Sequence, residues 1–365
     1  MTTPPDPRTP RPRARGISIG TLAPGAANAI TDVPGVRVGH ATVWRDEPGG
    51  RGSARTGVTA ILPGPADGLF REPVPAGAAV LNGAGELTGF VALREWGVIE
   101  TPVLLTSTMA VGRVYDGAVA AAVAADPAVG DEDVVIPVVG ECDDSWLSDS
   151  ATVQVEADDA GRALAAAAGG AVVEGAVGAG TGMMCFGWKG GIGTASRALP
   201  EAGCTVGVLV LANFGSAPDL RVDGVPVGRL LPSPDDVPAR PAGSCIAVVA
   251  TDAPLAPNQL ERLARRAGLG LGRAGSVAHH GSGEIFLAFA TGGRVARADV
   301  GRRAATFPDR GLDGLFAATV EAAEESVLNA VWAAPEVAGR SGRVARALPH
   351  EPVLAQLRAA GRLTR

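Results

Sequence analysis

A buried strand that begins directly after a proline-rich segment places the strongest constraint on this chain. Residues 217–242 carry six prolines, and Gly243, Ser244 and an unbroken apolar run over residues 245–250 follow them. A short run of small and β-branched residues bounded by turn signals is typical of a central strand in a sheet. The sequence therefore predicts an exposed linker over residues 217–242 and, after it, a buried strand that begins with a serine.

Ser244 is the first candidate for a catalytic side chain. If the chain were cut between Gly243 and Ser244, the serine would gain a free α-amine next to its own hydroxyl. Such an amine has a pKa of about 7.7–8.0, so it can take the hydroxyl proton near neutral pH without a histidine. Taken alone, this stretch is more simply an ordinary junction between a loop and a strand, since Gly-Ser is common at such points.

The pattern of the whole chain favours a mixed α/β sandwich. Hydrophobic residues make up 46% of the chain and aromatic residues only 4%, so the core must be built from Ala, Val and Leu. Apolar runs predict strands over residues 36–44, 58–62, 103–106, 134–140, 205–212, 245–250 and 285–290. Helical spacing is found over residues 113–125, 158–169, 257–267 (ending at Gly268) and 312–333. Strands and helices alternate without a regular βαβ period, which indicates a sandwich.

Charge and hydropathy exclude several classes of partner. The net charge of −6 and the pI near 5.4 give no reason to expect nucleic acid or an anionic membrane surface. No apolar run reaches the roughly 18 residues that span a bilayer. Residues 1–15 are rich in Pro, Thr and Arg and lack the apolar segment of a secretory signal. We expect a cytoplasmic protein with a disordered arm over residues 1–15, one domain over residues 16–340, and a polar tail.

The sequence does not predict a metal or a bound cofactor. The four cysteines have no CxxC spacing, so buried free thiols are expected rather than a zinc site. The adjacent side chains of His279 and His280 should diverge, and no ligand motif surrounds them. The glycine-rich segment in which Lys189 precedes Gly190 lacks Walker spacing, so it predicts backbone turns rather than a phosphate site.

Several motifs occur in the order found in one enzyme family. They are residues 28–40, residues 55–63, residues 190–197, and residues 244–255 with the helical segment that follows. On these motifs the chain resembles the L-aminopeptidase/D-esterase/D-amidase family, which includes the bacterial β-aminopeptidases and is distantly related to the nylon-oligomer hydrolases. The resemblance covers about residues 14–335.

The resemblance implies a fold and a processing event. The fold is a four-layer αββα sandwich, similar to that of the N-terminal nucleophile hydrolases but with different chain connectivity. Self-cleavage between Gly243 and Ser244 would give an α-chain of residues 1–243 and a β-chain of residues 244–365. The family resemblance also implies a homo-oligomer, a tetramer of αβ units.

Five residues receive roles from this resemblance. Ser244 matches the nucleophile, and Ser282 and Glu284 match residues that hydrogen-bond the nucleophile and its amine. Alternation along a strand would put Ser282 and Glu284 on one face. Asn213 matches an asparagine whose side-chain amide helps to form the oxyanion hole. Glu141, expected with other carboxylates at the end of the strand over residues 134–140, matches the carboxylate that binds the amino group of the substrate.

Asp143 departs from the pattern of the family. The best-known members have an aromatic residue, commonly tyrosine, two positions after the glutamate that matches Glu141. A carboxylate cannot donate a hydrogen bond to an oxyanion as a phenol can, and its negative charge would oppose one. The resemblance therefore does not imply a second oxyanion donor at position 143, nor does it imply that this chain has the substrate range of the family.

The leading hypothesis is a self-processing serine aminopeptidase or amidase that acts on short peptides, amino-acid amides or esters, including β- or D-residues, without a cofactor. One alternative is an endo-acting amidase of linear oligoamides, which would not need Glu141 to bind an amine. Another is a scaffold of the same fold that has lost activity through the change at Asp143. Intact masses separate an unprocessed scaffold from the enzymes, and N-acetylated substrates separate the two enzymes.

Overall fold

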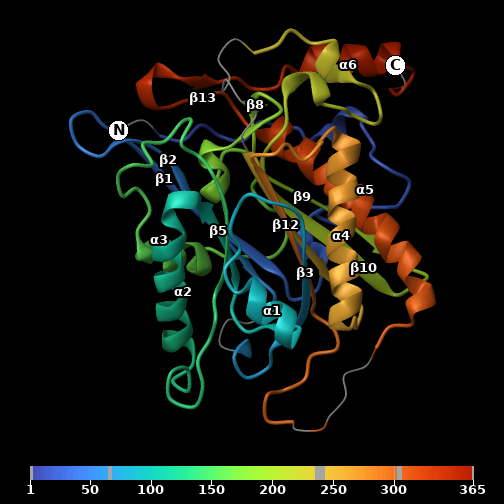
Figure 1. The fold of residues 1–365 in the computed structure, drawn as a ribbon. Coiled ribbons are helices and arrows are strands. Elements are labelled where there is room, and N and C mark those ends of the chain that lie inside the picture. Colours follow the sequence, from blue (N-terminus) through green and yellow to red (C-terminus); the bar gives the residue numbers. More distant parts are fainter. Residues whose placement is uncertain (1–2, 65–67, 235–242, 300, 302–305, 364–365) are drawn as a thin grey trace.

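Two β-sheets packed face to face form the centre of the protein (Figure 1). The computed structural model describes residues 3–64, 68–234, 243–299, 301 and 306–363. The strands of the smaller sheet are, in spatial order, β1 (Arg37–Glu47), β2 (Gly52–Leu62), β5 (Val103–Ser107) and β6 (Val138–Cys142). Those of the larger sheet are β4 (Val98–Ile99), β3 (Val74–Gly83), β12 (Ser282–Ala290), β11 (Gly243–Thr251), β10 (Cys204–Asn213) and β9 (Gly191–Leu199).

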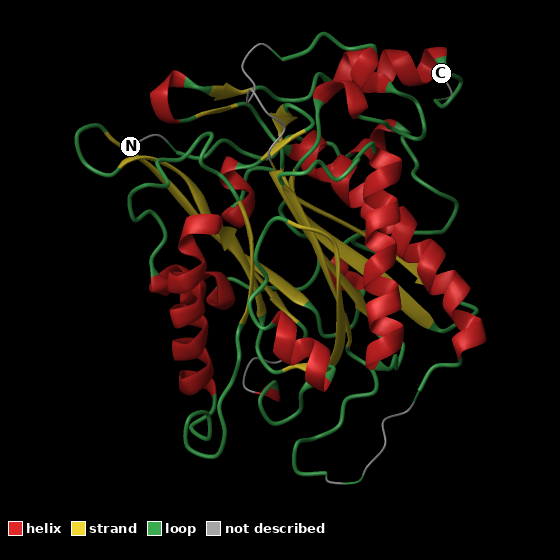
Figure 2. Cartoon of the chain, viewed as in Figure 1, coloured by secondary structure: helices red, strands yellow, loops and turns green. Residues whose placement is uncertain are grey.

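Helices cover the outer face of each sheet, which gives four layers (Figure 2). The smaller sheet carries α2 (Val111–Ala125) and α3 (Ala157–Ala165), and the larger sheet carries α4 (Pro257–Ala274) and α5 (Leu312–Ala333). Two further helices are α1 (Phe90–Trp96) and α6 (His350–Ala359). There are also two small hairpins among the described residues. One pairs β7 (Met184–Cys185) with β8 (Trp188–Lys189), and the other pairs β13 (Val337–Ala338) with β14 (Val344–Ala345). The predicted αββα sandwich is confirmed.

The strand that follows the proline-rich segment lies in the middle of the larger sheet, as predicted. All nine residues of β11 are buried, between antiparallel β10 on one side and parallel β12 on the other. Alternate side chains point to opposite faces, so Ile246 and Val248 join the core between the two sheets. Cys245 and Ala247 instead join the core beneath α4 and α5. Burial on both faces explains why the sequence shows a continuous apolar run here.

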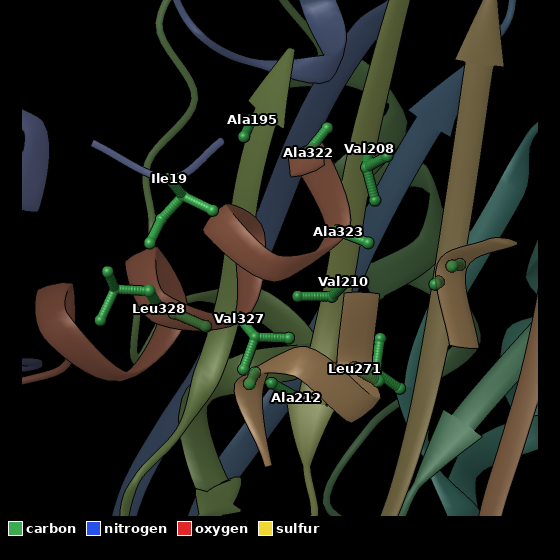
Figure 3. Packing of buried hydrophobic residues seen from close by; sticks show 14 of the residues in the cluster. Ile19, Ala195, Val208, Val210, Ala212, Leu271, Ala322, Ala323, Val327 and Leu328 are labelled. Atoms are coloured by element: carbon green, nitrogen blue, oxygen red, sulfur yellow. The ribbon is translucent and has the colours of Figure 1, made fainter. Parts of the chain in front are cut away.

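Small residues let the helices approach the larger sheet and each other closely. Figure 3 shows Val327 and Ala323 of α5 packed near Val210 of β10. A Cβ at Gly270 would lie 2.6 Å from the Cβ of Ala323, so glycine allows α4 to contact α5. Helix α4 continues beyond Gly268, where the sequence predicted its end, and stops only at Gly275, whose φ of 116° lies in the left-handed region that ends helices.

Other predicted boundaries also differ from the structure. The strand predicted over residues 134–140 begins only at Val138, because Pro137 has no N–H for the ladder and Val134 is 64% exposed. The strand then continues to Cys142, so Glu141 lies within it rather than beyond its end. Helix α3 ends at Ala165, before the predicted end at residue 169.

The segment predicted to be an exposed linker is partly folded into the core. Most of its described apolar side chains are buried, although Leu230 is exposed: the buried ones are Ala217, Leu220, Val222, Val225, Val227 and Leu231. These residues pack in the same cluster as α4 and α6, so the prediction was wrong for this half of the segment. Residues 235–242, which include Pro238 and Pro241, lie outside the described residues.

The two ends of the chain pack against the body of the protein. The stretch predicted to be a disordered arm contains Arg11, which pairs with Glu174, and Arg13, which pairs with Glu325. The polar tail forms α6, whose buried Leu354 joins the core beneath α4 and α5.

Of the helices that the structure describes, none is both long and apolar enough to cross a membrane. The four cysteines are buried free thiols, as predicted.

A buried ionic network joins the N-terminal segment and β9 to α5. Arg197 of β9 is fully buried and donates to Glu321 at 2.9 Å and to Glu325 at 2.7 Å. Glu325 also accepts from Arg13 at 2.7 Å and from Asn28 at 2.7 Å. Burial opposes ionisation of Glu325, but the hydrogen bond from Arg13 and the charges of Arg197 and Arg13 outweigh it and lower the pKa of this carboxyl group.

Candidate active site

Ser244 lies near the beginning of β11, where three strands bring functional groups together. Its side chain is 6% exposed, and the main-chain N–H of Gly283 donates to Ser244 Oγ at 3.3 Å. The antiparallel register sets Asn213 of β10 directly opposite Ser244. Directly opposite residues of an antiparallel pair project from the same face of the sheet, so Asn213 and Ser244 are neighbours on the face that points toward the smaller sheet.

A cavity of about 520 Å³ opens beside the Gly243–Ser244 bond. Both residues of that bond line it, together with Glu141 and Asp143 from the region of β6. The structure therefore brings the predicted nucleophile and the predicted substrate-binding carboxylate to one cavity. Its volume suits a small ligand rather than a folded protein.

Glu141 is held in a defined orientation within the cavity wall. It is 2% exposed and accepts hydrogen bonds from the main-chain N–H of Glu86, at 2.9 Å, and from the hydroxyl of Thr108. Burial raises the pKa of Glu141 above its ordinary value; the two hydrogen bonds oppose this, and the charge of Asp143 adds to it. A partly desolvated carboxylate with satisfied hydrogen bonds is suited to pair with a cation.

The three carboxylates that the sequence placed together separate in the structure. Asp143 is exposed, and its carboxylate accepts from the N–H and hydroxyl of Ser145 at 2.8 and 2.9 Å. Asp144 is buried, does not line the cavity, and accepts from the hydroxyl of Ser107 at 2.8 Å. Burial raises the pKa of Asp144 to about 7. The cavity thus holds Glu141 and Asp143 without the third carboxylate.

Asn213 is fixed by hydrogen bonds at both ends of its amide. Its Oδ1 accepts from the main-chain N–H of Met184 at 2.7 Å, and its Nδ2 donates to the main-chain carbonyl of Asp143 at 2.9 Å. An amide nitrogen carries two N–H groups, so a second donor remains for an oxyanion. Asp143 therefore accepts a hydrogen bond from Asn213 through its main-chain carbonyl, while its carboxylate accepts hydrogen bonds from Ser145 in the turn.

Ser282 and Glu284 form a buried pair on β12. The hydroxyl of Ser282 donates to Glu284, and the register sets these residues opposite Gly243 and Cys245, on either side of Ser244. They share one face of the strand, as alternation predicted. Among the described residues, no hydrogen bond joins either side chain to Ser244, whose nitrogen is here a peptide group of the strand. Burial raises the pKa of Glu284, against the hydrogen bond from Ser282.

Sequence reasoning missed three groups at this site. Thr108 follows β5 directly, and a strand end was a signal that could have found it. The N–H groups of Gly283 and Met184 contact Ser244 and Asn213, but any residue type supplies a main-chain N–H, so no sequence signal marks them. Within the described ranges, His, Cys, Asp and Glu do not gather in threes as a metal site requires.

The chain was compared with known proteins. A sequence model described as peptidase family S58 matches residues 28–345. The curated "Beta-peptidyl aminopeptidase BapA" of Sphingosinicella microcystinivorans is 42% identical over 381 aligned positions, which cover 96% of this chain and 93% of that protein.

Solved structures agree with this match. A Burkholderia sp. beta-aminopeptidase is 44% identical with a TM-score of 0.88, covering 96% of this chain and 99% of its own. The L-aminopeptidase D-Ala-esterase/amidase from Ochrobactrum anthropi, described as a prototype for the serine aminopeptidases and a variant of the Ntn hydrolase fold, is 39% identical with a TM-score of 0.90. That comparison covers 98% of this chain and 100% of the other.

Proposed function

The chain belongs to peptidase family S58, and from this we propose that it is a self-processing serine aminopeptidase or amidase with Ser244 as its nucleophile. The observation that carries the proposal is the cavity that Ser244 shares with Glu141. A nucleophile and an amine-binding carboxylate in one small cavity suit removal of a single residue from a free amino terminus. The substrates would be short peptides, amino-acid amides or esters.

In the first reaction the enzyme cuts its own chain. Ser244 Oγ attacks the carbonyl carbon of Gly243, the C–N bond breaks as the hydroxyl proton passes to the leaving nitrogen, and the main chain continues through an ester to the serine oxygen. Water then hydrolyses this ester, which leaves a carboxylate on Gly243 and a free α-amine on Ser244. The position of Gly243 in the cavity wall supports this step, because water can reach the scissile bond there.

In the second reaction the mature enzyme turns over substrate. Ser244 Oγ attacks the substrate carbonyl while the α-amine of Ser244 takes the hydroxyl proton and later passes it to the leaving amine. The free N–H of Asn213 stabilises the oxyanion, and water hydrolyses the acyl-enzyme. Ser282 and Glu284 lie on either side of Ser244 in the register and would hold the α-amine once Gly243 has left it.

Removing the charge of Glu141 should weaken turnover of substrates with a free amine. A charge-assisted hydrogen bond contributes about 1.5–3 kcal/mol, so Glu141→Gln should lower kcat/KM roughly ten- to a hundredfold. Self-cleavage should be spared, because no substrate amine takes part in it. The measurement compares para-nitroanilides of Ala, β-Ala and D-Ala with their N-acetylated forms.

The same assay decides between the two enzyme hypotheses. The native enzyme should reject acetylated substrates, which cannot pair with Glu141, and a Glu86→Gln control should resemble it, because Glu86 contacts Glu141 through its main chain only. Equal turnover of acetylated and free substrates would exclude an aminopeptidase and favour the endo-acting amidase.

Asp143 should favour substrates that carry a second positive charge. Its exposed carboxylate lines the cavity near Glu141, and an exposed ion pair is worth about 0.2–1 kcal/mol. Asp143→Asn should therefore reduce the preference for lysine over alanine para-nitroanilide by roughly 1.4- to fivefold. If the ratio of the two kcat/KM values did not change, Asp143 would not contact the side chain of the substrate.

A further inference from the structure

Lys189 is a fully buried cation that the proposed mechanism does not use. It lies on β8, and its ammonium group donates to the main-chain carbonyls of Gly180, Met183 and Gly190 at 2.9, 2.8 and 2.8 Å. An ammonium group has three N–H donors, and each of them has an acceptor here. Burial lowers the pKa of Lys189 to about 7, but a neutral amine could serve only two of the three carbonyls.

The lysine and Asn213 bind opposite ends of one peptide unit. The carbonyl of Met183 accepts from Lys189, and the N–H of Met184, in the same peptide plane, donates to Asn213 Oδ1 at 2.7 Å. A peptide unit is planar, so holding its carbonyl also sets the direction of its N–H. The positive charge on the carbonyl side also polarises the unit and strengthens the N–H as a donor.

The orientation of the Asn213 amide decides which atom can reach the reacting carbonyl. With Oδ1 held by Met184, Nδ2 lies on the side of Asp143 and keeps one free N–H. If the amide turned over, the oxygen would take that place, and an oxygen cannot donate to an oxyanion. The N–H of Met184 and the carbonyl of Asp143 therefore select the productive orientation together, and Lys189 holds the first of these two groups.

We propose that Lys189 is a positioning residue for the oxyanion hole: it holds the Met183–Met184 peptide so that the N–H of Met184 fixes Asn213 with Nδ2 available to the reacting carbonyl. This inference rests on the proposed function, in which Asn213 stabilises the oxyanion. Lys189 acts through Asn213 and does not touch the substrate.

A double-mutant cycle on the processed enzyme tests this coupling. Lys189→Met removes the charge and the three donors at similar volume, and should lower kcat for alanine para-nitroanilide roughly ten- to a hundredfold with little change in KM. Asn213→Ala should lower kcat by about 10²–10³. In the Asn213→Ala background, Lys189→Met should have almost no further effect. Rates are divided by the processed fraction, measured by intact mass.

Two further variants separate positioning from general stability. Lys189→Gln keeps an NH2 group for two of the carbonyls, so it should retain more of kcat, and it carries the test if Lys189→Met does not fold. Gln259→Met is the matched control, because Gln259 is also buried and holds the loop carbonyl of Phe307 at 2.8 Å, near the end of β11 opposite to Ser244. It should lower the urea midpoint without lowering kcat.

The outcomes are distinct. Additive losses in the double mutant, or a normal kcat in Lys189→Met and Lys189→Gln while Asn213→Ala is slow, would overturn the positioning role and leave the proposed function intact. A normal kcat in Asn213→Ala would refute the oxyanion assignment itself, and the positioning role with it.

Discussion

Replacing Ser244 with alanine should leave a single chain of 36.5 kDa with no peptidase activity. The native protein should instead separate under denaturing conditions into chains of about 24 and 12 kDa, in proportion to 243 and 122 of its 365 residues. The reason is that one hydroxyl attacks both the Gly243 carbonyl and the substrate. Removing a serine nucleophile lowers kcat by roughly 10⁶ in a comparable enzyme, so turnover should fall to background.

Intact mass and N-terminal sequencing check this result. Ser244→Thr keeps a hydroxyl and should still cleave, more slowly, because the added methyl group crowds a buried position. Ser326→Ala removes another buried serine, on α5, and should be processed normally. Efficient cleavage of Ser244→Ala at the same bond would refute the assignment of the nucleophile.

Removing the charge of Glu325 should cost about 3–5 kcal/mol of the free energy of unfolding, because Arg13 loses its ion-pair partner and the buried Arg197 loses one of its two. Urea unfolding of Glu325→Gln in the Ser244→Ala chain measures this without separating two chains. Glu351→Gln is the control: Glu351 pairs with Arg15 at the surface, so this change should leave the free energy of unfolding almost unchanged.

The same residue predicts how stability depends on pH. The pKa of Glu325 is lowered in the folded state, so its contribution is present above the pKa of an unfolded glutamate and is lost as pH falls through the folded value. The Ser244→Ala chain should therefore lose more stability than the same chain with Glu325→Gln on acidification from pH 6 to about pH 3. Equal losses in the two proteins would contradict the role of this carboxylate.

Features that depend on local sequence were predicted well. The apolar run after Ser244 gave the central strand, and helix α5 has the predicted bounds Leu312–Ala333. These elements are long or buried on every side, so their patterns are unambiguous. The linker prediction failed because it relied on the prolines and neglected the valines and leucines between them. These apolar side chains pack against residues that are distant in the sequence, and a local pattern cannot reveal such contacts.

Side-chain direction and main-chain partners could not be predicted. The resemblance led us to expect an aromatic residue at position 143, where the chain has Asp143; its carboxylate accepts hydrogen bonds from Ser145 in a turn, and its carbonyl accepts one from Asn213. The spacing Asp-x-Ser was a signal for such a turn. From the sequence, Lys189 was only a residue next to glycine-rich turns. Its role could not be predicted, because its three hydrogen-bond partners are main-chain carbonyls, which every residue type has.

The order of strands in the larger sheet has a consequence for the lifetime of the enzyme. Strands β11 and β12, which follow the predicted cut, lie between β10 and β3, which precede it, so the two chains interleave in one sheet. Once cut, a molecule that unfolds releases two fragments that must find each other again, and each exposes unpaired strand edges that invite aggregation. Processing therefore turns folding into a one-way event, and the rate of unfolding, rather than an equilibrium, determines how long the mature enzyme survives.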